Sequence, residues 1–191
     1  LNHNYVWDDL IVITNNEKVK KGLGGLKEIF MEYNPNSEEI DEQYGYRPIT
    51  LSSFALDVEI FGANPYYGHL MNILYFSLLC VVLFLCLRML FYDYSIWLPF
   101  FATLLFAVHP IHVEVVANIK SRDEIFALLF GLLALIAAIK YIEKDKIYHV
   151  LISIFCFILA ILSKEHLTIF SIVIPLTIML FYKVSFNKIL K

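Results

Sequence analysis

The sequence predicts an all-α integral membrane protein, a multi-span helical bundle preceded by a polar segment. Hydrophobic residues make up 59% of the 191 residues, and the mean hydropathy is +0.67, whereas soluble domains are about 45–50% apolar. The excess lies after Tyr66, where apolar runs of helical length alternate with short polar turns. We therefore divide the chain into an extracytoplasmic loop, residues 1–64, and a five-span transmembrane bundle, residues 65–191.

Five apolar runs are predicted to cross the membrane, because about 20 apolar residues span a bilayer. They cover approximately residues 66–90, 96–108, 125–142, 147–162 and 167–182, and the second is short. Asn64-Pro65 opens the first run, and Tyr92-Asp93-Tyr94 forms the turn that follows it. Charged residues at 143–146 and 163–165 separate the later runs.

The polar segment is predicted to carry amphipathic surface helices. Residues 22–31 have apolar side chains at helical spacing, and so do residues 49–61, which end at Gly62. Residues 34–43 contain Pro35 and four acidic residues and are predicted to form a loop.

Charge and cysteine content exclude some classes of function. The net charge of −3 provides no basic surface for nucleic acid. The cysteines lie inside apolar runs and are interpreted as small buried hydrophobic residues: Cys80, Cys86 and Cys156. The chain begins at Leu1 without a methionine and ends just after a span, so we expect it to be an internal part of a longer membrane protein.

Lysine and arginine in the short loops predict the orientation. One side, predicted to be cytoplasmic, carries Arg88, Lys140, Lys144, Lys146, Lys183, Lys188 and Lys191. The opposite, extracytoplasmic side then receives the acidic pair Asp8–Asp9, Arg47, the connector His109–Glu124 and Lys164–Glu165. This gathering of ionisable groups on one side of the bundle is the main functional signal, since such groups next to a bilayer are costly to keep.

The connector, HPIHVEVVANIKSRDE, is predicted to be a short helix at the membrane surface. His109, His112 and Glu114 have a spacing that could hold a divalent metal on one helical turn. We favour the alternative that the histidines form hydrogen bonds at the interface or contact a phosphate, and we assign no metal and no certain cofactor.

The acidic pair and the surrounding cations suit group transfer from a lipid-linked phosphate. Adjacent aspartates in an extended segment point to opposite sides, so one can act as a base while the other makes supporting contacts. The candidate phosphate ligands are the cations of the same face: Arg47, His109, Lys120, Arg122 and Lys164. The candidate supporting residues are His112, Glu114, Asp123, Glu124 and Glu165.

Structural interpretations remain open beside these roles. Asp8–Asp9 could cap a helix or form a solvated pair. Residues 122–124 could begin a helix whose acids complement the helix dipole, and Lys164–Glu165 could form a salt-bridged turn. Asp57 and Asn72 are predicted to satisfy polar groups between helices.

Several motifs, in a consistent order, are similar to those of a known enzyme family. Trp7-Asp8-Asp9 resembles the acidic motif of the membrane glycosyltransferases of the GT-C superfamily. The transmembrane and tetratricopeptide-repeat protein O-mannosyltransferases and their bacterial relatives resemble the chain at Tyr46-Arg47-Pro48, Leu51–Phe54, Phe61–Pro65, His69–Asn72, HPIHVE, Ser121–Glu124 and Ser163-Lys164-Glu165.

The resemblance implies a GT-C helical bundle that transfers mannose from a polyprenyl-phosphate donor to serine or threonine of exported proteins by inverting displacement. It implies Asp8 as the base, with Asp9 beside it. The implied location is a bacterial inner membrane or the endoplasmic reticulum, with the active face extracytoplasmic or lumenal. The alternatives are a GT-C enzyme with a lipid or glycan acceptor, and a transporter or assembly subunit without catalysis, which would carry charges in the middle of its spans.

Overall fold

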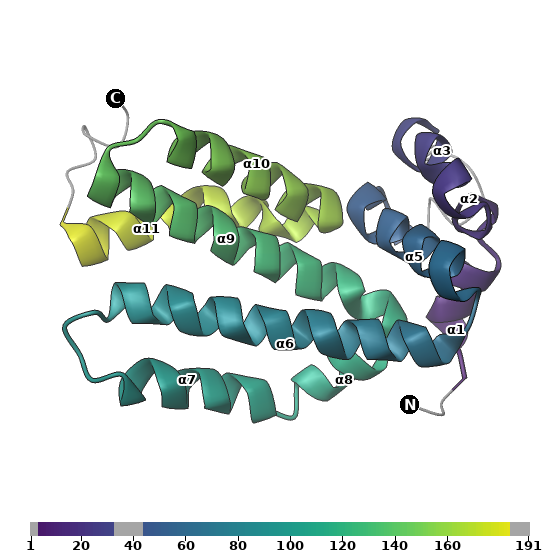
Figure 1. The fold of residues 1–191 in the computed structure, drawn as a ribbon, viewed down its shortest axis with the longest axis horizontal. Helices are drawn as coiled ribbons and strands as arrows, with labels where there is room; N and C mark the ends of the chain where they lie inside the picture. Colours follow the sequence, from purple (N-terminus) through teal and green to yellow (C-terminus); the bar gives the residue numbers. More distant parts are fainter. Residues whose placement is uncertain (1–3, 33–43, 184–191) are drawn as a thin grey trace.

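The computed structural model describes residues 4–32 and 44–183, and the described part is a helical bundle with a helical cap at one end (Figure 1). This confirms the predicted all-α membrane class. The predicted loop 34–43 and the cations Lys188 and Lys191 lie outside the described residues. The bundle contains α6 (Pro65–Leu90), α7 (Trp97–Val108), α8 (His112–Ala117), α9 (Arg122–Lys144), α10 (Tyr148–Ser163) and α11 (Phe170–Tyr182).

Three helical stretches are long and apolar enough to cross a membrane: Pro65–Leu90, Ile119–Lys144 and Glu165–Tyr182. The second includes the 3₁₀ turn η3 (Ile119–Ser121) and the third begins with η4 (Glu165–Ile169). Helices α7 and α10 are shorter, with 12 and 16 residues. At 1.5 Å per residue they are about 18 and 24 Å long, less than the roughly 30 Å of bilayer hydrocarbon, so five complete crossings stay a prediction.

Local sequence explains where the helices begin and end. The Asn64 side chain accepts a hydrogen bond from the Tyr66 N–H at 3.0 Å, and Pro65 occupies the first turn of α6. Helix α9 ends at Asp145, which adopts the left-handed conformation. The second run ends at Val108 because Pro110 restricts the preceding backbone, and α8 starts two residues later as a separate short helix.

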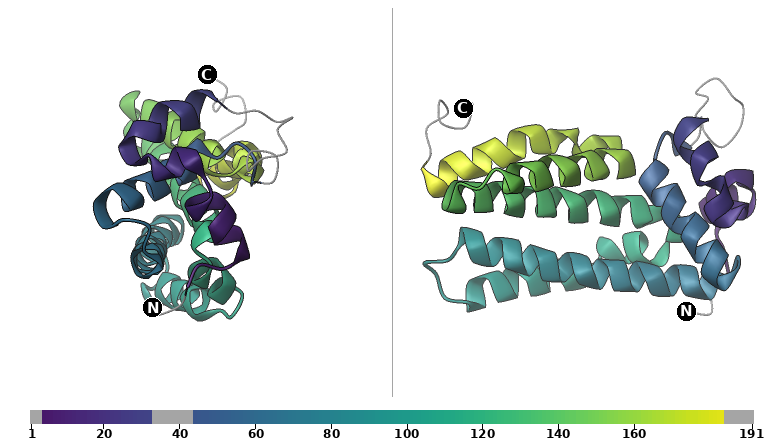
Figure 2. Two further views of the ribbon diagram at one scale, coloured as in Figure 1. Left: turned by 90° about the vertical axis from the view of Figure 1, so that its right-hand side faces the viewer. Right: turned by 45° about the horizontal axis from the view of Figure 1, so that its top comes forward.

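The cap packs across the end of α6, α9 and α10, and Figure 2 shows this end face-on in its left panel. It consists of α1 (Trp7–Asp9), η1 (Leu10–Thr14), α2 (Glu17–Lys20), η2 (Gly22–Gly25), α3 (Leu26–Met31) and α5 (Pro48–Phe61). The helices predicted at 22–31 and 49–61 are present. The extended conformation expected around Asp8–Asp9 was wrong, because these residues lie in α1, where hydrogen bonds from the Asp9 and Leu10 N–H groups to the Val6 carbonyl close a helical turn.

Two apolar cores hold the cap and the bundle. The cap core is centred on Phe54 and Ala55 of α5 and includes Ile119, which enters from the bundle and is fully buried. The bundle core lies between α6 and α9, with Leu79 and Leu129 among its buried members. Ile119 thus joins the cap core directly to the connector that carries the predicted site residues.

Candidate active site

Asp9 fastens the start of the cap to the connector. Its carboxylate is fully buried, and it accepts hydrogen bonds from the Val6 N–H at 3.2 Å and from the Lys120 N–H at 2.7 Å. Burial raises the pKa of Asp9, while the two backbone N–H groups act in the opposite direction. With both oxygens occupied by backbone donors, Asp9 has the geometry of a positioning residue.

Asp8 points outward at the same place. Its Oδ2 lies 2.7 Å from the Nζ of Lys120, and the side chains of Asp8 and Lys120 are 51% and 30% exposed. Asp8 is therefore the carboxylate of the pair that solvent and a substrate can reach. The structure brings these two predicted site residues, 112 positions apart in sequence, into direct contact.

Hydrogen bonds from Asn72 and Tyr44 hold the backbone around Lys120. Asn72 of α6 donates from its amide nitrogen to the carbonyls of Asn118 and Ile119, at 3.1 and 3.3 Å. The hydroxyl of Tyr44 donates to the Lys120 carbonyl at 3.4 Å. Burial raises the pKa of Tyr44 well above its usual value, so the phenol stays protonated and can donate. The lysine backbone is fixed, and its ammonium end is the part left to move.

Arg122, predicted as a phosphate ligand, is fully enclosed. Its guanidinium bonds the Asn72 side chain at 2.8 Å, Ser53 Oγ at 3.1 Å and the Gly68 carbonyl at 3.2 Å, and it lies 2.6 Å from the Asp57 carboxylate. These contacts join α5, α6 and α9. In this arrangement Arg122 acts as a structural anchor, and phosphate binding by it stays a prediction.

A second charged cluster joins the start of α5, the start of α9 and the end of α10. The buried Asp123 carboxylate pairs with Arg47, and Lys164 lies 3.5 Å away. Lys164 also pairs with Glu124, and Arg47 lies 3.7 Å from Glu165. Two predicted phosphate ligands are thus tied to three carboxylates.

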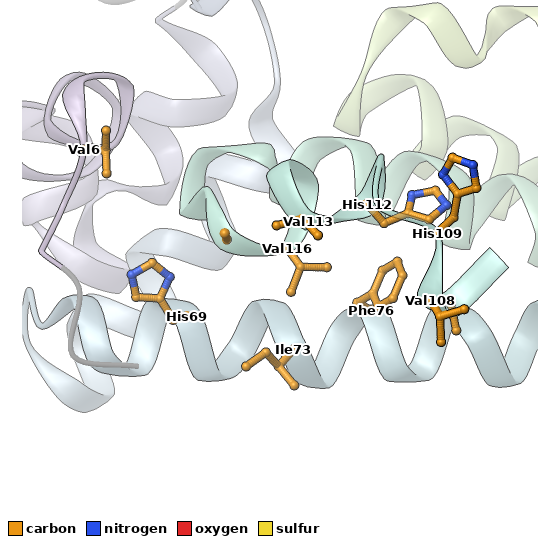
Figure 3. Close-up of a pocket in the computed structure, with 11 residues that line it drawn as sticks. Val6, His69, Ile73, Phe76, Val108, His109, His112, Val113 and Val116 are labelled. Atoms are coloured by element: carbon orange, nitrogen blue, oxygen red, sulfur yellow. The ribbon is translucent and has the colours of Figure 1, made fainter. Parts of the chain in front are cut away.

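An apolar cavity of about 730 Å³ extends along α6 between that helix and α7–α8 (Figure 3). Val6 and His69 line one end, next to the acidic pair. His109 and His112 line the other end, where His112 packs on the ring of Phe106 with centroids 4.2 Å apart. The two connector histidines are therefore not brought to the Asp8–Lys120 pair.

The connector residues do not assemble a metal site in this conformation. Over residues 4–32 and 44–183, no three His, Cys, Asp or Glu side chains converge as metal ligands would. The Nδ1 of His109 accepts a hydrogen bond from the Ile111 N–H at 3.2 Å, and Glu114 is exposed on α8. From the sequence, no site role was predicted for Tyr44, which lies in no motif, or for His69, which was noted only as part of the His69–Asn72 motif.

Comparison with known proteins gives the family. The chain is 32% identical to Protein O-mannosyl-transferase TMTC1 of Homo sapiens over an alignment of 182 residues, and the match covers 88% of the chain and 20% of that protein. It is 32% identical to Protein O-mannosyl-transferase F38B6.6 of Caenorhabditis elegans over an alignment of 168 residues, and the match covers 86% of the chain and 24% of that protein. It is 41% identical to Protein O-mannosyl-transferase TMTC2 of Homo sapiens over 96 residues, half of the chain and 11% of that protein.

No protein-family model and no solved structure matches the chain. The chain spans about a fifth of the length of the curated relatives that cover most of it. Similarity at this level over nearly the whole chain, with the motifs gathered at one end of a membrane bundle, establishes that the chain belongs to the TMTC family of protein O-mannosyl-transferases.

Proposed function

We propose that this chain forms the donor-binding part of a protein O-mannosyltransferase. In this proposal mannose passes from a polyprenyl-phosphate donor to a serine or threonine hydroxyl of an exported protein, at the extracytoplasmic or lumenal face. The observation that carries the proposal is the half-exposed Asp8–Lys120 pair beside an apolar cavity at one end of the bundle.

The roles follow from exposure and contacts. Asp8 is the base that accepts the proton of the acceptor hydroxyl, because it is the exposed carboxylate of the acidic pair, whereas Asp9 is buried. Lys120 binds the donor phosphate as a point charge. Asp9 holds both in register through its hydrogen bonds to the backbone of Val6 and Lys120.

The cavity suits the isoprenoid part of such a donor. Its lining is mostly aliphatic and aromatic, with Ile73, Phe76 and Val116 among the lining side chains, and it begins at Val6, three residues from Asp9. An apolar chain in this cavity would lie between membrane helices while its phosphate stays near Lys120. Four other cations are candidate phosphate ligands of second rank. Three of them are paired with carboxylates, and the fourth lies at the far end of the cavity: Arg47, Arg122 and Lys164, and His109.

Charge placement favours an enzyme over a transporter. In the described helices, charged residues of α6 and α9 stand in the first or last turns, as Arg88, Arg122 and Lys144 do, or one turn further in, as Lys140 does. A transport path would require charges near mid-depth.

Replacing Asp8 by Asn in the full-length gene product tests the proposal. Loss of a general base lowers rates by about 10²–10⁴-fold, so mannose transfer from polyprenyl-phosphate mannose should fall by at least about 100-fold while donor binding persists. Lys20→Gln, which removes a surface lysine paired with Glu17, is the control with full activity. Unchanged turnover in Asp8→Asn would overturn the assignment of the base.

Mass spectrometry of exported proteins from cells with and without the gene identifies the acceptor. We expect hexose to disappear from serine and threonine in the deletion strain. Loss of hexose from a lipid or a glycan instead would replace the protein acceptor by one of the alternatives and leave the donor chemistry in place.

A further inference from the structure

The contact between Asp8 and Lys120 places a cation directly on the proposed base. The Nζ of Lys120 lies 2.7 Å from the Oδ2 of Asp8, so the ammonium is hydrogen-bonded to the carboxylate proposed as the base. The next carboxylate, Asp9, is occupied by the backbone N–H groups of Val6 and Lys120 and does not bind the ammonium in place of Asp8. The Lys120 ammonium therefore occupies the Asp8 carboxylate until it finds a second anionic partner.

The ammonium group of Lys120 can change its partner while the backbone of this residue stays in place. Asp9 binds its N–H and Tyr44 binds its carbonyl, so the backbone is fixed from two sides. The ammonium group ends a flexible four-carbon stem, and the Lys120 side chain is 30% exposed. Rotation about the side-chain bonds moves the ammonium from Asp8 to a neighbouring anion without breaking any of these backbone contacts.

We propose that Lys120 is shared between Asp8 and the donor phosphate and passes from the carboxylate to the phosphate as mannose is transferred. This inference rests on the proposed function. In the transfer step the acceptor hydroxyl gives its proton to Asp8, and its oxygen forms a bond to the anomeric carbon of mannose. The bond from that carbon to the phosphate oxygen breaks, and the electron pair stays on the phosphate.

The charges change in opposite directions around the lysine. Asp8 goes from −1 to neutral when it takes the proton, and the phosphate goes from a diester with charge −1 to a monoester that approaches −2. One ammonium group between them leaves the partner that loses charge and follows the partner that gains it. The interaction is therefore stronger in the transition state than in the ground state, as catalysis requires.

Other cations of this end are less able to take the role. Arg122 is fully buried among Asp57, Asn72 and Ser53. Arg47 and Lys164 both pair with the buried Asp123. Within the described residues, Lys120 combines a fixed backbone, a partly exposed side chain and contact with the exposed carboxylate of the acidic pair.

A double-mutant cycle on ligand binding tests the exchange without relying on catalysis. Farnesyl phosphate, mostly a dianion at pH 7.5 because its second pKa is about 6, is titrated calorimetrically into the full-length protein and the variants Asp8→Asn, Lys120→Gln and the double variant. If Asp8 competes with the phosphate for Lys120, Asp8→Asn should bind about 5–10-fold more tightly than the wild type, and Lys120→Gln about 10-fold more weakly.

The double variant separates exchange from simple repulsion. Competition for Lys120 predicts that Asp8→Asn changes affinity by less than about 2-fold once Lys120 is absent. Through-space repulsion by Asp8 predicts the same tightening in both backgrounds, and that result would overturn the exchange. Lys120→Arg, which keeps the charge, should restore most of the affinity, and Lys20→Gln should change nothing.

Activity distinguishes the failure of this inference from the failure of the proposed function. Absence of mannose transfer by the wild-type protein would remove the proposed function itself. Transfer that is present, together with additive effects of Asp8→Asn and Lys120→Gln on binding, would leave the function standing and refute the exchange alone.

Discussion

Removing the Arg122 side chain tests whether this residue anchors the fold or binds the donor. In Arg122→Met the buried Asp57 carboxylate loses its counter-charge at 2.6 Å, and Asn72, Ser53 and the Gly68 carbonyl lose a donor. Removing one partner of a buried ion pair costs about 3–5 kcal/mol. Since 1 kcal/mol shifts the melting temperature by about 2–4 °C in a chain of 150–250 residues, we expect a decrease of about 6–20 °C.

Thermal unfolding in detergent, followed by circular dichroism, measures this decrease. The double variant Arg122→Met/Asp57→Leu should recover a good part of it, because replacing both members of a buried pair by apolar residues is often close to neutral. Lys20→Met, which removes an exposed lysine, is the control and should remain within about 0.5 kcal/mol of the wild type. If Arg122→Met melts within 2 °C of the wild type and instead binds farnesyl phosphate more weakly, the anchor role is refuted and direct phosphate contact takes its place.

Two further changes probe the contacts that place the connector. In Gly68→Ala the added Cβ would lie 2.8 Å from the Cδ1 of the fully buried Ile119, whereas the Cβ added in Gly24→Ala would meet no atom within 4 Å. We expect the free energy of unfolding to fall by about 1–3 kcal/mol in Gly68→Ala and to stay unchanged in Gly24→Ala. Equal melting temperatures of the two variants would contradict this packing. For Asp9, burial raises the folded-state pKa above 3.8, so the folded state binds the proton more tightly and the carboxyl's contribution to stability is lost as the pH rises from about 4 through the folded pKa. The melting temperature of Asp9→Asn, relative to that of the wild type, should therefore rise between pH 4 and 7. A difference in melting temperature that stays constant over this range would refute the raised pKa of Asp9.

Hydrophobic patterning was sufficient for most of the fold. The run after Asn64-Pro65 has a length that fits only a membrane helix, and its start carries both a side-chain cap and a first-turn proline. The amphipathic pattern of residues 49–61 correctly gave α5, because burial of Leu51, Phe54 and Ala55 on one face produces that periodicity. Such signals are local, and the sequence displays them directly.

Local patterns could not give the conformation of the acidic motif. Extended geometry was expected at Asp8–Asp9, but the α1 turn forms because Asp9 binds the Val6 N–H within the turn and the Lys120 N–H across the fold. The second of these contacts depends on tertiary packing 111 residues away. The positions of Tyr44 and His69 could not be predicted for the same reason, because their contacts also depend on tertiary packing.

Burial, and not residue type, decides which charged residues are structural and which are available to a substrate. Arg122 and Lys120 are two residues apart in one connector, and the sequence offers no reason to treat them differently. Arg122 points inward between α5 and α6, where its hydrogen bonds and ion pair hold the cap on the bundle. The Lys120 side chain points outward to Asp8.

The buried ion pairs of Arg122 and Asp123 support the exposed Asp8–Lys120 pair. The enclosed contacts of Arg122 and of Asp123 with Arg47 fix the ends of the helices from which the connector emerges. Only against such a rigid frame can Lys120 move its ammonium by a few ångströms and change its partner while its backbone stays in place. The buried charges thus contribute to the proposed chemistry by keeping everything except the reacting side chains still.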